Sequence, residues 1–147
     1  MLNRFTLFFV LLLIELFLVA CTAGDQGGIA IEDVWGRPSP GSASNAAFYM
    51  TIENTGQEPD SLFAAAIDIC GATELHMSNI DDAGVMSMQQ VQQIDIPAGE
   101  TVALEPGGLH VMCIDRQADL NPGDRVSISL SFTRAGEIVV EAEISEN

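Results

Sequence analysis

The chain has two histidines, His76 and His110, and methionines lie close to both of them in the sequence. Four of the six methionines belong to this group: Met77, Met86, Met88 and Met112. Thioether sulfur is a soft, neutral ligand, and imidazole nitrogen binds copper well, so the two together suit Cu(I) better than a hard cation. The residue types therefore indicate a Cu(I) site.

The spacing of these residues is compatible with such a site. Side chains two residues apart in a strand point to the same face, so His110 projects with Met112, and Met86 with Met88. Taken singly, a histidine in a strand or a methionine in a core is an ordinary structural residue. The joint pattern favours the metal site, because polar Ser87 separates two methionines where a core strand favours a β-branched residue.

Other kinds of site fit the sequence less well. A blue-copper centre needs a cysteine thiolate, two histidines and an axial methionine, but Cys113 follows His110, no histidine lies downstream, and alternation puts Cys113 on the opposite face. We find no nucleophile elbow, phosphate-binding loop, zinc-ligand spacing or calcium loop. We therefore expect a metal-binding protein that is not an enzyme.

The first twenty residues have the pattern of an export signal. A short basic start ending at Arg4 precedes an apolar run that contains one charge, Glu15. The segment from Leu18 to Cys21 resembles the bacterial lipoprotein box, in which the chain is cut before the cysteine and the cysteine carries lipid. The alternative is an uncleaved transmembrane helix, which Glu15 disfavours. Both interpretations place the rest of the chain in the periplasm or at the cell exterior.

We divide the chain into a signal at 1–20, a flexible tether at 21–28 and a single domain at 29–147. The sequence has five basic and twenty-one acidic residues, with a net charge of −16. This balance argues against nucleic acid and anionic lipid surfaces as partners.

Short alternating segments between turn sequences indicate an all-β domain. We expect eight or nine strands in an antiparallel Greek-key sandwich or barrel. Gly36 begins a turn sequence that we expect to end the first strand, and Gly71 is expected to interrupt the chain before the fourth. The expected strands are 29–35, 46–52, 73–78, 85–91, 101–104, 109–114, 125–132 and 137–144, with 61–69 as a strand or a helix.

Two stretches of the domain resemble the PCu(A)C family of bacterial periplasmic copper chaperones. They are residues 74–88 and 96–112, and the similarity extends over 31–144. The family's signature is His, about ten residues, Met, twenty-one residues, and then His-x-Met. Here 21 residues separate Met88 from His110, as in the signature, whereas 11 separate His76 from Met88, which is one more. A turn at 80–84 can absorb an insertion at small cost.

The resemblance implies a cupredoxin-like Greek-key β-sandwich that delivers copper to the Cu(A) centre of a cytochrome c oxidase subunit. It also implies a Cu(I) site made of His76, Met88, His110 and Met112. Met86 and Met77 are either substitutes for one of these ligands or residues that lie next to the ligands. A lipid at Cys21 would hold the domain near a membrane-bound oxidase.

Two other functions stay open on the sequence alone. One is a copper buffer or resistance protein without a dedicated acceptor, and the other is a metal-free structural β-sandwich with the His–Met cluster in its core. The state of Cys70 and Cys113 also stays open between a disulfide and two buried thiols, because nothing in the sequence fixes their distance.

Overall fold

The computed structural model describes residues 28–39 and 44–145, and the expected signal and Cys21 lie outside them. Every regular element in the described residues is a strand, so this part of the chain offers no apolar helix of membrane-spanning length. The strands are β1 (Ile29–Pro38), β2 (Ala46–Asn54), β3 (Asp60–Ala66), β4 (Cys70–Ile80), β5 (Met86–Gln90), β6 (Ile94–Ile96), β7 (Thr101–Leu104), β8 (Leu109–Arg116), β9 (Arg125–Phe132) and β10 (Gly136–Ile144).

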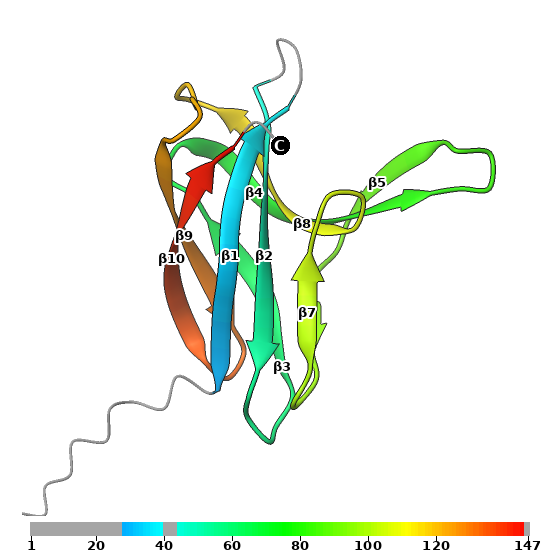
Figure 1. Ribbon diagram of the computed structural model, residues 1–147, viewed down its shortest axis with the longest axis vertical. Coiled ribbons are helices and arrows are strands. Elements are labelled where there is room, and N and C mark those ends of the chain that lie inside the picture. Colours follow the sequence, from blue (N-terminus) through cyan, green and yellow to red (C-terminus); the bar gives the residue numbers. More distant parts are fainter. Residues whose placement is uncertain (1–27, 40–43, 146–147) are drawn as a thin grey trace, which may run out of the picture.

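The strands follow the order β5-β4-β8-β2-β1-β10-β9-β3-β6 in one sheet, and β7 pairs with β2. β1 and β10 run parallel, and the other pairs are antiparallel. The sheet curls over, so that β3 contacts β4 although the two are not hydrogen-bonded neighbours (Figure 1). The prediction of an all-β sandwich is confirmed, but the described residues form ten strands rather than eight or nine, and the β1–β10 pair is parallel rather than antiparallel.

The core forms because alternate residues of each strand are apolar and turn inward. In β9, Val126, Ile128, Leu130 and Phe132 are buried as the alternation predicts. Each fully buried side chain of this kind contributes about 1.5–3 kcal/mol from removal of apolar surface from water. Met50 is the described methionine that belongs to this core, at 2 % exposure, and it lies outside the His–Met cluster.

The expectation that the first strand ends at Trp35 is wrong, because β1 continues to Pro38. Gly36 lies inside this strand for a packing reason: a Cβ there would come within 2.4 Å of the ring of Phe48. Gly71 likewise lies within β4 rather than before it, and the segment that could have been a helix forms β3.

A β-bulge at Asp33 changes the facing of the second half of β1. Asp33 has a φ of 53°, and the pairing with β2 shifts between Glu32 and Trp35. Without the bulge, simple alternation would place Trp35 on the core side with Ile31. With it, Trp35 pairs with Tyr49 and points to the outer face of the sheet.

A disulfide joins Cys70 of β4 to Cys113 of β8, with 5.5 Å between the Cα atoms and a sequence separation of 43. Cys113 is fully buried, on the core side of β8 as its alternation with His110 predicts. Both histidines and four of the methionines lie between the two cysteines in the sequence. The cross-link therefore encloses the whole predicted site in one covalent loop.

Candidate metal centre

The candidate site lies on the outer face of three adjacent strands, β5, β4 and β8. His76 of β4 is directly opposite His110 of β8, and Ser78 of β4 is opposite Met88 of β5. Directly opposed residues share a face, and so do residues two apart. The register therefore puts both histidines on the same face as Met88 and Met112.

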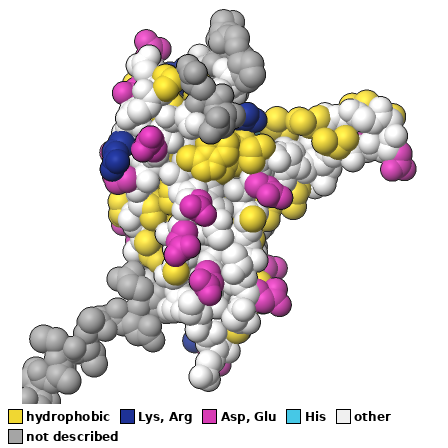
Figure 2. Space-filling view, in the orientation of Figure 1, with side chains coloured by type: hydrophobic (Ala, Val, Ile, Leu, Met, Phe, Trp, Pro, Cys, Tyr) yellow, Lys and Arg dark blue, Asp and Glu magenta, His cyan; other side chains and the backbone are white. Residues whose placement is uncertain are grey.

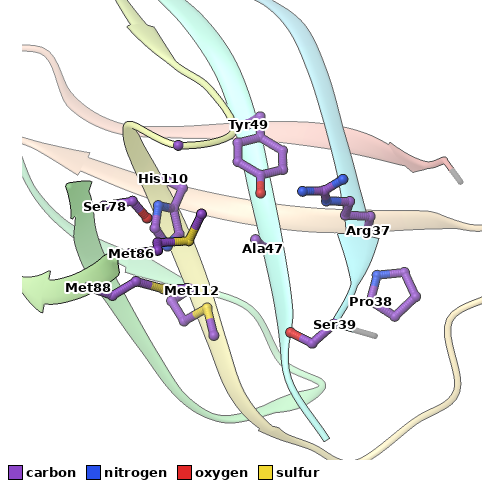
Figure 3. Close-up of a pocket in the computed structure, with 11 residues that line it drawn as sticks. Arg37, Pro38, Ser39, Ala47, Tyr49, Ser78, Met86, Met88, His110 and Met112 are labelled. Carbon is purple, nitrogen blue, oxygen red and sulfur yellow. The ribbon is translucent and has the colours of Figure 1, made fainter. Parts of the chain in front are cut away.

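A pocket of about 140 Å³ opens on this face. Figure 3 shows Met86, Met88, His110 and Met112 gathered on one side of it, with Tyr49 and Arg37 on the other. The pocket is lined by Arg37, Pro38, Ser39, Ala47, Tyr49, Ser78, Met86, Met88, Gly107, His110 and Met112. Three thioethers and one imidazole therefore reach a common space.

His76 does not line the pocket itself but contacts the ring that does. Its ring centroid lies 5.7 Å from that of His110, and the two ring planes are inclined by 66°. Its side chain is 15 % exposed. The Nε2 atom lies 2.7 Å from Oε2 of Glu74, and the Nδ1 atom is buried without a hydrogen-bond partner among the described residues.

His110 is buried, at 3 % exposure, and its Nδ1–H donates to the backbone carbonyl of Gly108 at 3.0 Å. Burial lowers the pKa of His110 below its ordinary value of 6.5; the hydrogen bond to Gly108 raises it, and the proximity of His76 lowers it further. The net effect keeps this imidazole neutral near pH 7. Only the neutral ring has a nitrogen lone pair to offer a metal.

The methionines of β5 are not core residues. Met86 and Met88 are 55 % and 54 % exposed. They belong to the arm, the hairpin of residues 76–90, which projects from the body of the sandwich (Figure 1). Hydrophobic side chains follow the arm in Figure 2, and the large exposed apolar residues on it are Ile80, Val85, Met86 and Met88.

Met77, one of the alternative ligands, lies away from the cluster. It pairs with Leu109 on one side and Gln89 on the other, so it occupies the opposite face of β4 from His76. Met86 lines the pocket together with Met88. Met88 is nearer in register to the histidine pair, because it is two residues from Gln90, the partner of His76.

The sequence pattern did not indicate an aromatic group that lies beside the pocket. The ring of Tyr49 lies 6.2 Å from that of His110 and 4.5 Å from that of Trp35, and the guanidinium of Arg37 lies over it at 5.9 Å. Tyr49 is 5 % exposed. Alternation along β2 could have placed Tyr49 on the face of Ala47, but Trp35 reaches this face only through the bulge at Asp33.

The donor atoms around the pocket are of the kinds that a soft metal ion prefers. No group of three or more His, Cys, Asp or Glu side chains able to hold a metal ion occurs within 28–39 and 44–145. An ion bound between His76 and His110 would therefore complete its coordination with thioether sulfur. Such a donor set carries no charge, which favours Cu(I) over Cu(II) or a hard divalent ion.

Comparison with known proteins agrees with this description. The family described as LpqE-like matches residues 29–144. Protein RP573 of Rickettsia prowazekii is 32 % identical over 126 residues, which is 83 % of this chain and 69 % of that protein. Lxx21020 of Leifsonia xyli subsp. xyli, named as a candidate lipoprotein, is 32 % identical over 116 residues, which is 78 % of this chain and 68 % of that protein.

Solved structures share the fold. The apo PCuAC domain of PmoF1 matches with a TM-score of 0.70 and 30 % identity, over 82 % of this chain and 96 % of that domain. The copper-bound PCuAC domain of PmoF2 matches with a TM-score of 0.66 and 28 % identity, over 82 % and 95 %. The Cu(I) form of DR1885 from Deinococcus radiodurans gives 0.62 and 28 %, over 87 % and 86 %. The expected cupredoxin-like sandwich is confirmed.

Proposed function

This chain belongs to the LpqE-like family and its domain is of the PCuAC type, and from that premise we propose that it is an exported Cu(I) chaperone. It delivers the ion to the Cu(A) centre of a cytochrome c oxidase. The chain binds Cu(I) through His76, Met88, His110 and Met112.

One observation carries the proposal: two opposed imidazoles share a sheet face with the thioethers, and one of them, His110, lines the same pocket as Met88 and Met112. His76 and His110 lie ring to ring, and Nδ1 of His76 is buried without a hydrogen-bond partner among the described residues. A buried ring nitrogen of this kind fits a metal ligand, since binding an ion satisfies its lone pair.

The exposure of the site supports a carrier that releases its ion. Met86 and Met88 are more than half exposed, so another protein can approach the copper from their side. An acceptor with cysteine thiolates, which are softer and charged, should displace the thioethers one at a time. The copper would then pass by ligand exchange, without a free ion in solution.

The exposure of these two methionines also weighs against a metal-free structural role. A core cluster would bury its methionines as the sandwich buries Met50. A buffer without an acceptor would use the same ligands, and it differs from a chaperone only in copper transfer.

The proposed location is the outer side of a membrane, with a lipid on Cys21 as the anchor. The lipoprotein-like Leu18–Cys21 sequence and the name of the Leifsonia relative support this. A lipid anchor would keep the copper site near a membrane-bound oxidase.

Titration of the protein with Cu(I) against a chromogenic chelator tests the ligand set. We expect one bound ion, and we expect His76→Ala and His110→Ala to lower the affinity strongly. Met77→Leu is a matched control, since Met77 is on the opposite face of the same strand. Equal affinity of the wild type and both histidine variants would contradict the assignment of His76 and His110 as Cu(I) ligands.

Transfer is tested separately by mixing the loaded protein with an apo Cu(A) domain and following the visible spectrum of the acceptor. We expect the acceptor to gain copper and the chaperone to lose it. Tight Cu(I) binding without transfer would support a copper buffer and contradict the chaperone function.

A further inference from the structure

Glu74 and His76 form a short contact on the outer face of β4. Oε2 of Glu74 lies 2.7 Å from Nε2 of His76. An ionised carboxylate only accepts hydrogen bonds, so the proton in this contact belongs to Nε2. The neutral His76 ring is therefore the Nε2–H tautomer, and its lone pair is on Nδ1.

His110 has the opposite tautomer. Its Nδ1 lies 3.0 Å from the carbonyl oxygen of Gly108, and a carbonyl also only accepts. The proton is therefore on Nδ1, and the lone pair is on Nε2. Two different acceptors, one side chain and one backbone group, thus fix the two rings in complementary states.

The free nitrogen of His76 is in a position where it needs a partner. Nδ1 is buried and makes no hydrogen bond within the described residues. The rings of His76 and His110 are 5.7 Å apart. The hydrogen bond that Nε2–H of His76 donates to Glu74 is thus the contact that keeps the lone pair of His76 on Nδ1.

We propose that Glu74 is a positioning residue for the copper site. It holds the proton of His76 on Nε2, so that Cu(I) is bound by Nδ1 of His76 and by Nε2 of His110. This inference rests on the proposed Cu(I) site. Carboxylate–histidine pairs of this type orient metal ligands and raise their basicity.

The fold explains why Glu74 is available for this role. It is two residues before His76 on the same strand face, and it pairs with Met112 of β8. Its side chain is 31 % exposed. Glu74 therefore flanks the ligands without being one of them.

Long-range ¹H–¹⁵N spectra of the apo protein in mildly alkaline solution test the tautomers directly. We expect the protonated-type nitrogen shift at Nε2 of His76 and at Nδ1 of His110. On Cu(I) loading, Nδ1 of His76 and Nε2 of His110 should change shift, while the other two nitrogens keep their protons. A mixture of tautomers at His76 in the wild type would overturn the proposal.

Substitution of Glu74 tests the energetic role. We expect Glu74→Ala to lower Cu(I) affinity about 10- to 100-fold and to give a tautomer mixture at His76. Glu74→Gln should recover most of the affinity, since its amide oxygen still accepts from Nε2–H. Glu141→Ala removes a carboxylate from the exposed part of β10 and should leave affinity unchanged, which controls for lost negative charge.

The outcomes separate this inference from the proposed function. A wild type that does not bind Cu(I) through its histidines would remove the site itself. A wild type that binds normally, together with Glu74→Ala of unchanged affinity and unchanged His76 tautomer, would overturn the role of Glu74 alone. Should Glu74→Ala fail to fold, the tautomer measurement on the wild type still decides.

Discussion

His76 and His110 face each other across the β4–β8 pair, ring to ring, on the outer face of the sheet. The two residues are 34 positions apart in the sequence, and a disulfide at 70 and 113 closes the loop that contains them. The geometry of the site therefore depends on the register of one strand pair.

Replacing Met88 with leucine should remove a ligand while keeping the shape of the side chain. The swap costs little stability at an exposed position. We expect Cu(I) affinity to fall by about tenfold or more, equivalent to about 1.4 kcal/mol of binding free energy. Met86→Leu should have a smaller effect because Met86 is further in register from the histidines. A chelator competition assay measures both, and an effect of Met77→Leu as large as that of Met88→Leu would contradict the assignment.

The pKa of His110 should be below 6.5 in the apo protein because its ring is buried. Above pH 6.5 the His110 ring is neutral in both the folded and the unfolded chain, so its protonation does not lower the free energy of unfolding there. As the pH falls from 6.5 through the lower folded pKa, the unfolded chain binds the proton more readily, and stability is lost.

Proton NMR titration of the two histidine rings measures this pKa, and urea unfolding at pH 8 and pH 5.5 measures the linkage. The His110→Gln variant should lose less stability between these two pH values than the wild type. A His110 midpoint at or above 6.5 would contradict the prediction.

Removing the disulfide by Cys70→Ala with Cys113→Ala should lower the free energy of unfolding by about 4 kcal/mol, from the chain entropy of a loop of this length. The cysteines are 43 positions apart, and the loop contains the whole candidate site. Urea unfolding of the oxidised wild type and the double variant gives the difference. Equal unfolding midpoints would show that the cross-link does not form in the folded protein.

Gly36→Ala should destabilise the sandwich by about 1–3 kcal/mol, since the new methyl group meets the ring of Phe48. The double variant Gly36→Ala with Phe48→Leu should be less destabilised than the sum of the two single changes, because leucine leaves room for the methyl group. Thermal unfolding of the four proteins completes the cycle, and strict additivity would argue against the steric explanation.

The alternation of apolar residues predicts much of this fold correctly. The pattern in β9 places Val126 and Phe132 in the core, and the alternation in β8 places Cys113 on the core face of the sheet and His110 on the outer face. These predictions succeed because each depends only on the facing of neighbours within one regular strand.

The pairing of distant residues could not be predicted in the same way. Trp35 reaches the outer face because Asp33 adopts a left-handed conformation that forms a β-bulge. The sequence pattern does not predict this bulge. Gly36 reads as a turn residue until the ring of Phe48 is placed against it. The hydrogen bond of Glu74 depends on a side-chain conformation that spacing alone leaves open.

The direction of β1 has a consequence for how the molecule reaches its partners. The strand begins at Ile29 and runs along the sandwich to Pro38 (Figure 1). Pro38 lines the pocket. Ten residues of strand extend about 30 Å. In the proposed lipid-anchored form, the end of β1 that lines the pocket would be the end farther along the strand from the anchor.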